Sequence, residues 1–113
     1  MKPRRWNPED VAPPLGRYSH LAEVPPGHRL VFVSGQLGVL PDGTLAGPEH
    51  LVKLLTLVAG TEHLPGYRAA QADVFAKWFP DGDFPAQSLA VVAALAGPDY
   101  TAEVEAVAAV PAP

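Results

Sequence analysis

Apolar and polar positions alternate most clearly near the end of the chain. In residues 100–110 small and branched apolar side chains fall on one face, and Glu103 and Glu105 fall on the other. A period of two is typical of a strand. The apolar run at residues 88–95 is a second predicted strand, although a helix is an alternative there because Ala and Leu favour helices. A tight reversal at residues 96–99, Ala-Gly-Pro-Asp, is predicted to join the two strands.

Strand patterns also occupy most of the first half of the chain. Residues 29–36, Arg-Leu-Val-Phe-Val-Ser-Gly-Gln, are dense in β-branched and aromatic side chains and predict a strand buried on both faces. Residues 18–24 predict a shorter strand, and the turn at residues 25–28 predicts that these two strands form an antiparallel hairpin. Residues 39–46 predict a second, smaller hairpin around Asp-Gly. Residues 51–58 predict a strand in preference to a helix, because the run is short and a glycine follows it.

One amphipathic helix is expected between Pro65, which suits a first helical turn, and Pro80. Arg68 is predicted to lie elsewhere on the helix surface than the mostly apolar stripe. The stripe consists of Tyr67, Gln71, Val74, Phe75 and Trp78. Four prolines predict an irregular arm over residues 1–15. The order of elements predicts one α+β domain over residues 1–113, with a helix packed on one face of a sheet.

Composition narrows the classes of function. The chain has 113 residues, of which 48% are hydrophobic and 18% charged, so a single packed domain is expected. Its formal net charge of −4, without a basic cluster, argues against nucleic-acid binding. The absence of cysteine excludes disulfides and thiol nucleophiles. Neither a secretory signal nor a membrane-spanning run is evident, so we expect a cytoplasmic protein without membrane contact.

Most motifs for cofactors and metals are missing. The four histidines, at positions 20, 28, 50 and 63, lack metal-ligand spacing. Ser34 lacks the first glycine of a Gly-x-Ser-x-Gly elbow, and no phosphate or dinucleotide loop is present, so no cofactor is expected. What remains is a set of polar residues at strand ends. Any one of them alone is explained by hydrogen bonds to local backbone groups. The set comprises Tyr18, Ser19, Ser34, Gly35, Gln36, Gln87, Ser88 and Glu103.

These motifs, in this order, resemble the YjgF/RidA family of reactive-imine deaminases. Residues 16–19, Gly-Arg-Tyr-Ser, resemble the family's Gly-x-Tyr-Ser, and residues 31–36 resemble its Ser-Gly-Gln strand. Residues 41–44, Pro-Asp-Gly-Thr, resemble its second hairpin. Residues 84–88, Phe-Pro-Ala-Gln-Ser, resemble its Phe-Pro-Ala-Arg-Ser/Thr, and residues 102–108 resemble its closing Val-Glu-Ile-Glu-Ala-Ile-Ala. The motifs are specific only in combination, and together they cover most of the chain.

The resemblance implies a ferredoxin-like, chorismate-mutase-like α+β fold and a homotrimer with sites in clefts between subunits. In the family, the arginine after Pro-Ala binds the substrate carboxylate. The first glutamate of Glu-x-Glu positions the water that attacks the imine carbon, which releases ammonia and leaves a 2-oxo acid. The corresponding residues here are Gln87 and Glu103, and Tyr18, Ser34 and Ser88 are expected to line the cleft.

Two departures from the family pattern stand out. Gln87 carries no charge, so it cannot replace the ionic part of carboxylate binding, which is a loss of about 1.5–3 kcal/mol. In addition, residues 47–50 lead directly into the strand at residue 51, where the family has a whole helix. One of two helices is therefore expected to be absent, which leaves apolar sheet surface open or covered by another subunit.

Three hypotheses follow. The first is an atypical RidA-like protein that binds a small metabolite, such as a carboxylate, in inter-subunit clefts and has weak or lost deaminase activity. The second is an active imine or enamine deaminase, a hydrolase acting on C=N bonds, which uses Glu103 and water while Arg17 of a neighbouring subunit binds the substrate. The third is a structural or protein-interaction module, suggested by the proline-rich ends and the absent helix.

Overall fold

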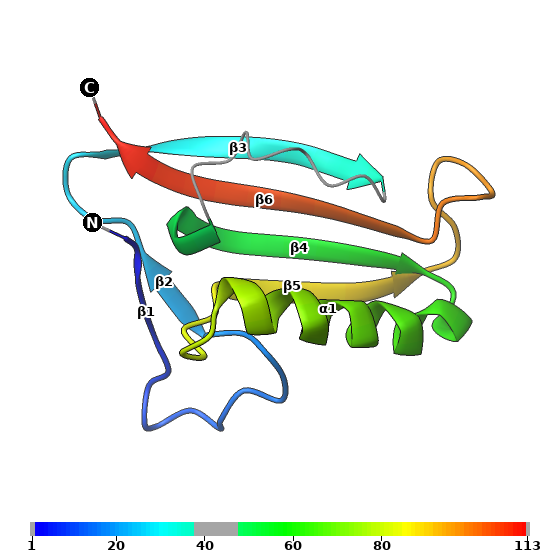
Figure 1. Cartoon of the computed structure of the whole chain (residues 1–113), viewed down its shortest axis with the longest axis horizontal. Coiled ribbons are helices and arrows are strands. Elements are labelled where there is room, and N and C mark those ends of the chain that lie inside the picture. Colours follow the sequence, from blue (N-terminus) through cyan, green and yellow to red (C-terminus); the bar gives the residue numbers. More distant parts are fainter. Residues whose placement is uncertain (1, 38–47, 113) are drawn as a thin grey trace.

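The chain folds as one mixed sheet with one helix layer and a small two-stranded ribbon (Figure 1). A computed structural model describes residues 2–37 and 48–112, except for the side chains of residues 33–37. The strand order of the four-stranded sheet is β3-β6-β4-β5. The elements are β1 Arg4–Trp6, β2 Leu21–Glu23, β3 His28–Leu37, the 3-10 turn η1 Pro48–His50, β4 Leu51–Ala59, the 3-10 turn η2 Thr61–His63, α1 Leu64–Trp78, β5 Ala86–Val92 and β6 Ala102–Pro111. The predicted α+β fold, with a helix on one face of a mixed sheet, is confirmed.

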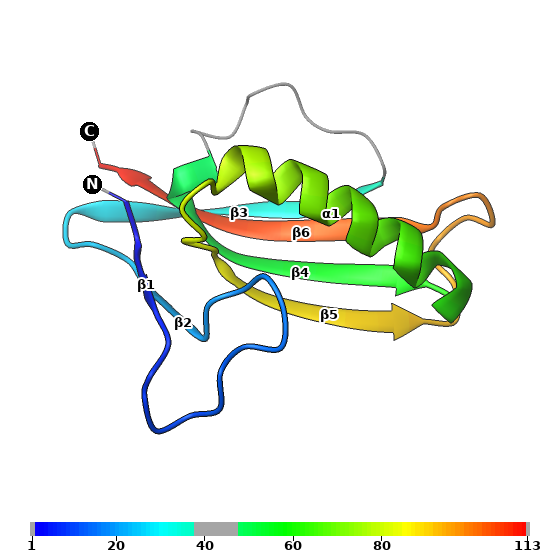
Figure 2. The same ribbon diagram turned by 60° about the horizontal axis from the view of Figure 1, so that its bottom comes forward.

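Strands β4 and β5 run parallel and are connected by α1, which crosses one face of the sheet (Figure 2). Gly60 turns the chain from β4 towards the helix with a φ of 76°, a left-handed conformation that favours glycine. Pro65 lies at the start of α1, where its missing N–H leaves no helical hydrogen bond unmade. The predicted strand at residues 51–58 and the helix that follows it are both confirmed.

The two C-terminal strands form as expected but are not neighbours. Strand β6 lies between β3 and β4 and is antiparallel to both, while β5 occupies the edge of the sheet. The predicted tight reversal at residues 96–99 is therefore wrong as a hairpin, and the connection spans residues 93–101. The apolar composition of β6 explains its central place, since Ala106, Ala108 and Ala109 are all buried.

The N-terminal part differs from the prediction in its pairing. Strand β2 pairs with β1, and β3 pairs with β6, so the predicted hairpin between residues 18–24 and 29–36 is wrong. Strand β1 lies inside the region predicted to be an irregular arm, because prolines prevent a helix but leave room for a three-residue strand. The second predicted hairpin, at residues 39–46, lies outside the described residues.

The core lies between the sheet and α1. It consists of Leu51, Leu54, Phe75, Phe79, Ala106 and Ala108. The register of β4 against β6 shifts between Leu51 and Lys53, and this irregularity allows both Leu51 and Leu54 to face the helix. Of the predicted helical stripe only Phe75 is fully buried. No helix in the described part of the chain is long and apolar enough to cross a membrane.

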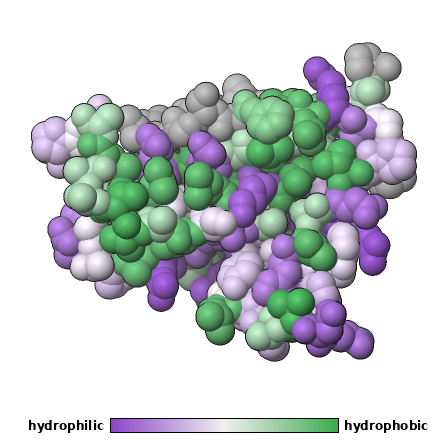
Figure 3. All heavy atoms as spheres, turned by 180° about the vertical axis from the view of Figure 1, so that it is seen from behind, coloured by the Kyte–Doolittle hydropathy of each residue, from purple (hydrophilic) through white to green (hydrophobic). Residues whose placement is uncertain are grey.

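The face of the sheet opposite α1, here called the open face, carries exposed apolar side chains. Phe32 is 74% exposed and Leu30 is 47% exposed. Figure 3 shows hydrophobic side chains gathered over this side of the molecule. The prediction that residues 29–36 are buried on both faces is therefore wrong for the single chain. Within the described residues α1 is the only α-helix, and the 3-10 turn η1 leads directly into β4.

Arg5 attaches the N-terminal arm to the sheet. Its side chain is 1% exposed, and its guanidinium group donates to the carbonyl oxygens of Leu51 (2.8 Å) and Glu49 (3.1 Å), and to that of Asp83. It also lies 3.5 Å from the Asp83 carboxylate and 5.2 Å from the centre of the Phe79 ring. Burial lowers the pKa of Arg5, and the charge of Asp83 opposes that shift. Arg5 thus connects segments that are far apart in sequence.

Candidate binding pocket

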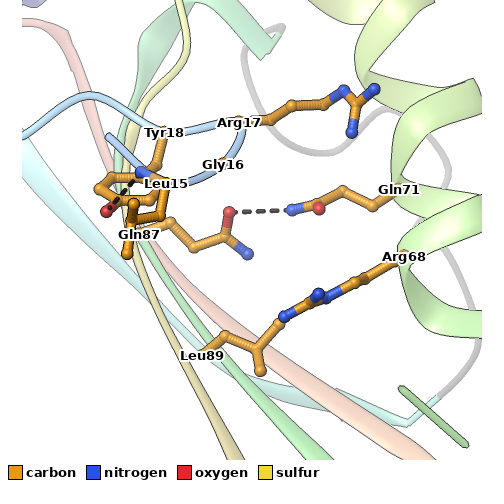
Figure 4. Close-up of a pocket in the computed structure, with 8 residues that line it drawn as sticks. All are labelled: Leu15, Gly16, Arg17, Tyr18, Arg68, Gln71, Gln87 and Leu89. Atoms are coloured by element: carbon orange, nitrogen blue, oxygen red, sulfur yellow. Dashed lines mark hydrogen bonds between the residues drawn. The ribbon is translucent and has the colours of Figure 1, made fainter. Parts of the chain in front are cut away.

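A pocket of about 410 Å³ lies between the N-terminal loop, α1 and the edge strand β5 (Figure 4). Alternation along β5 places Gln87 and Leu89 on the face beneath α1, and a spacing of three places Arg68 and Gln71 on one side of the helix. The N-terminal loop closes the remaining side. The residues that line the pocket are Leu15, Gly16, Arg17, Tyr18, Arg68, Gln71, Gln87 and Leu89.

Ser19 holds the loop wall of the pocket against the sheet. Its backbone N–H donates to the carbonyl of Pro85 at 3.0 Å, and its hydroxyl donates to the carbonyl of Phe84. Within the loop, the Leu15 N–H donates to the hydroxyl of Tyr18 at 3.2 Å. The loop is therefore fixed both internally and to the start of β5, which determines where Tyr18 lies.

The floor of the pocket is a network of neutral hydrogen bonds. Gln71 donates an N–H of its amide to Oε1 of Gln87 at 2.9 Å. The amide nitrogen of Gln87 donates to Oγ1 of Thr56 at 3.2 Å and to the hydroxyl of Tyr67 at 3.3 Å. The hydroxyl groups of Thr56 and Tyr67 are hydrogen-bonded to each other, with 3.1 Å between their oxygens. Thr56 is fully buried. Gln87 thus uses its carbonyl oxygen and its amide nitrogen to pair with neighbours that would be costly to leave unpaired.

The pocket is locally positive in a chain of negative net charge. Its lining contains Arg17 and Arg68 and no acidic residue, whereas the chain as a whole carries −4. Neither arginine forms a hydrogen bond or an ion pair with another residue that the structure describes. In Figure 4 the hydrogen bond between Gln71 and Gln87 lies between the two arginine side chains. The arrangement suits a small ligand with a negative group.

Comparisons with known proteins decide the fold family. No protein-family model and no curated protein matches the chain by sequence. Among solved structures, YyfB from Yersinia pestis, a protein of unknown function of the Rid family, matches with a TM-score of 0.74 and 27% identity, over 97% of this chain and 100% of YyfB. The YjgF gene product of E. coli matches with a TM-score of 0.52 and 22% identity, over 93% and 97% of the two chains. This chain has the YjgF/Rid fold.

A third matching structure carries a ligand. E. coli TdcF, solved with bound serine, matches with a TM-score of 0.52 and 18% identity over 96% of each chain. The likeness to TdcF and to YjgF concerns the fold alone. The resemblance that the sequence motifs indicated is thereby confirmed at the level of the Rid fold.

The Rid fold brings some of the predicted site residues together and separates others. Arg17, Tyr18 and Gln87 line the same pocket. Glu103 pairs with Leu57 on β4, whereas Gln87 pairs with Leu54. These partners are three residues apart on one strand, so Gln87 and Glu103 lie on opposite faces of the sheet.

Of the two other residues predicted to bind the ligand, Ser88 does not line the pocket. Ser88 lies on the open face, where Lys53 donates to its hydroxyl at 2.7 Å. Ser34 lies in β3, and its side chain is outside the described part of the structure. The catalytic role of Glu103 and the binding roles of Ser88 and Ser34 stay predictions.

Two pocket residues were missed from the sequence. Arg68 was placed on the outer surface of the predicted helix, and Gln71 was counted as the polar member of its apolar stripe. Gln71 itself was the signal that could have indicated the pocket, because a glutamine in a helical stripe that faces a sheet needs a polar partner on that sheet. Its partner is Gln87.

Proposed function

We propose that this chain is a small-molecule-binding protein of the Rid fold whose imine-deaminase activity is weak or lost. The observation that carries the proposal is the state of Gln87, which stands after Pro-Ala where the family motif has arginine. Its amide is hydrogen-bonded to three neutral partners, Gln71, Thr56 and Tyr67. Position 87 therefore offers a substrate carboxylate no charge, and its amide is already held by the protein.

The position of Glu103 supports the same proposal. Within one subunit Glu103 and Gln87 lie on opposite faces of the sheet, so one small ligand cannot contact both. A Rid-type hydrolysis using Glu103 would need a second subunit to supply the other side of the cleft. The bound serine of TdcF supports a ligand of amino-acid size for this fold.

The proposal includes assembly into a homotrimer through the open face, with clefts between subunits. Phe32 and Leu30 are exposed there in the single chain. Apolar patches of this kind are typical of protein–protein interfaces. A second copy of the chain covers them in the proposed assembly.

Ammonia release from freshly generated 2-aminoacrylate tests the proposed loss of deaminase activity. We expect the rate with this protein to equal the rate of spontaneous hydrolysis, and an arginine-bearing Rid protein serves as the positive control. A rate comparable with that control overturns the proposal. In that case Glu103→Gln would decide the mechanism, because an active deaminase that uses Glu103 would lose its turnover.

A further inference from the structure

Two arginines line the pocket without a partner of their own. Four other cations of the described chain are engaged: Arg5 is buried against carbonyl oxygens, Lys2 lies 3.0 Å from the Asp83 carboxylate, Arg4 lies over the ring of Trp6, and Lys53 donates to Ser88. Arg17 and Arg68 have no hydrogen bond or ion pair among the described residues, which is also true of the exposed Arg29 and Lys77. Unlike Arg29 and Lys77, they line the pocket.

The electrostatic consequence is selection by charge. With two guanidinium groups and no carboxylate in the lining, a neutral ligand gains little, and a cation is repelled. A guanidinium group pairs with carboxylate and phosphate oxygens in a bidentate way, which adds geometric specificity to the attraction. We propose that Arg68, assisted by Arg17, makes this pocket a binding site for small organic oxyanions within a single subunit. This assignment rests on the proposed small-molecule-binding function.

The neutral network of the floor gives the site a second contact. Gln71 donates one amide N–H to Gln87. The other N–H and the carbonyl oxygen of Gln71 have no partner among the described residues. Leu15 and Leu89 add apolar surface to the lining. The ligand class is therefore a short-chain oxyanion with an apolar portion, and a polar substituent on it would reach Gln71.

A matched pair of probes tests the assignment. Butanoate and its neutral analogue butanamide, together with inorganic phosphate, are titrated into the ¹⁵N-labelled full chain at low salt, and shifts of the backbone amides of Gly16, Gln71 and Leu89 are followed. We expect butanoate to bind at least about tenfold more tightly than butanamide. This factor is at the low end of the range for charge-assisted hydrogen bonds, because both arginines are exposed to solvent. Raising the salt concentration should weaken butanoate binding but not butanamide binding.

Variants then assign the residue. Arg68→Gln should weaken butanoate binding by about tenfold. Lys77→Gln removes the same charge from the same helix outside the pocket lining and should leave affinity within about twofold. Both substitutions concern exposed side chains, so a native melting temperature is expected for each. Phosphate binding that depends on Arg68 supports the oxyanion assignment and identifies the phosphate class.

The result that overturns this inference differs from the one that overturns the proposed function. Equal binding of butanoate and butanamide, or unchanged butanoate affinity in Arg68→Gln, removes the oxyanion assignment and leaves a small-molecule pocket in place. The absence of shifts with all three probes also removes it. The deaminase part of the proposed function is judged separately by the ammonia assay.

Discussion

Restoring the arginine of the family motif should damage this protein rather than activate it. In Gln87→Arg, the new side chain has no acceptor for the N–H of Gln71 and brings a charge next to the buried hydroxyl of Thr56. It also adds a third cation to a pocket that already contains Arg17 and Arg68. The change therefore acts on a network whose members are neutral and mutually satisfied.

The expected magnitude follows from the lost contacts. An unsatisfied polar group costs about 1–3 kcal/mol, and Gln87 is half-buried, so we expect a loss of about 2–3 kcal/mol in the free energy of unfolding. For a domain of this size, that corresponds to a fall in melting temperature of about 6–12 °C. Urea unfolding and calorimetry measure both quantities, and ammonia release should stay at the spontaneous rate.

Ala76→Arg is the matched control for this variant. It introduces the same side chain at an exposed position of α1 outside the pocket lining. We expect a change of less than about 0.5 kcal/mol there. If Gln87→Arg were as stable as the native chain and released ammonia as fast as an arginine-bearing Rid protein, the reasoning from the neutral network would be refuted.

Three further predictions concern stability and assembly. Arg5→Met should lower the free energy of unfolding in urea by about 2–4 kcal/mol, because it leaves the part-buried carbonyl groups of Leu51 and Asp83 without their donor, and a loss below about 1 kcal/mol would contradict this role. Phe32→Glu should reduce the assembled mass measured by light scattering to that of a monomer, while Val11→Glu, an exposed loop substitution, should leave it unchanged; equal masses for the two variants would count against the open face as the interface. Gly60→Ala should lower the free energy of unfolding by about 1 kcal/mol or more, because the φ of Gly60 is 76°. Gly66→Ala should raise it by up to about 1 kcal/mol, because Gly66 lies inside α1 with open space around it. The opposite order would show that backbone conformation does not decide the difference.

Local patterns predicted the elements of this fold better than their pairing. Alternation in residues 100–110 and helical periodicity after Pro65 are properties of neighbouring residues, and both β6 and α1 form where expected. The place of β6 between β3 and β4, and the pairing of β2 with β1, depend on contacts between distant segments. The three residues of β1 are too few to display a pattern at all.

The candidate site divides in the same way. Motifs identified Tyr18, Arg17 and Gln87, which do share a pocket. Whether Glu103 joins them depends on strand register, which alternation within a single strand does not determine. Arg68 was missed because its role depends on how α1 is rotated above β5, and an exposed charge on a helix usually has no role beyond solvation.

The attachment of Arg5 has a consequence for the order in which the molecule assembles. Its carbonyl partners belong to η1, β4 and the segment before β5, and these come together only after the crossover through α1 is complete. The N-terminal arm, and with it the loop wall that ends at Ser19, is therefore expected to dock last during folding. In hydrogen exchange, the amides of this arm should open before those of the sheet. A chain that begins to unfold would then release its ligand while most of its sheet is still intact.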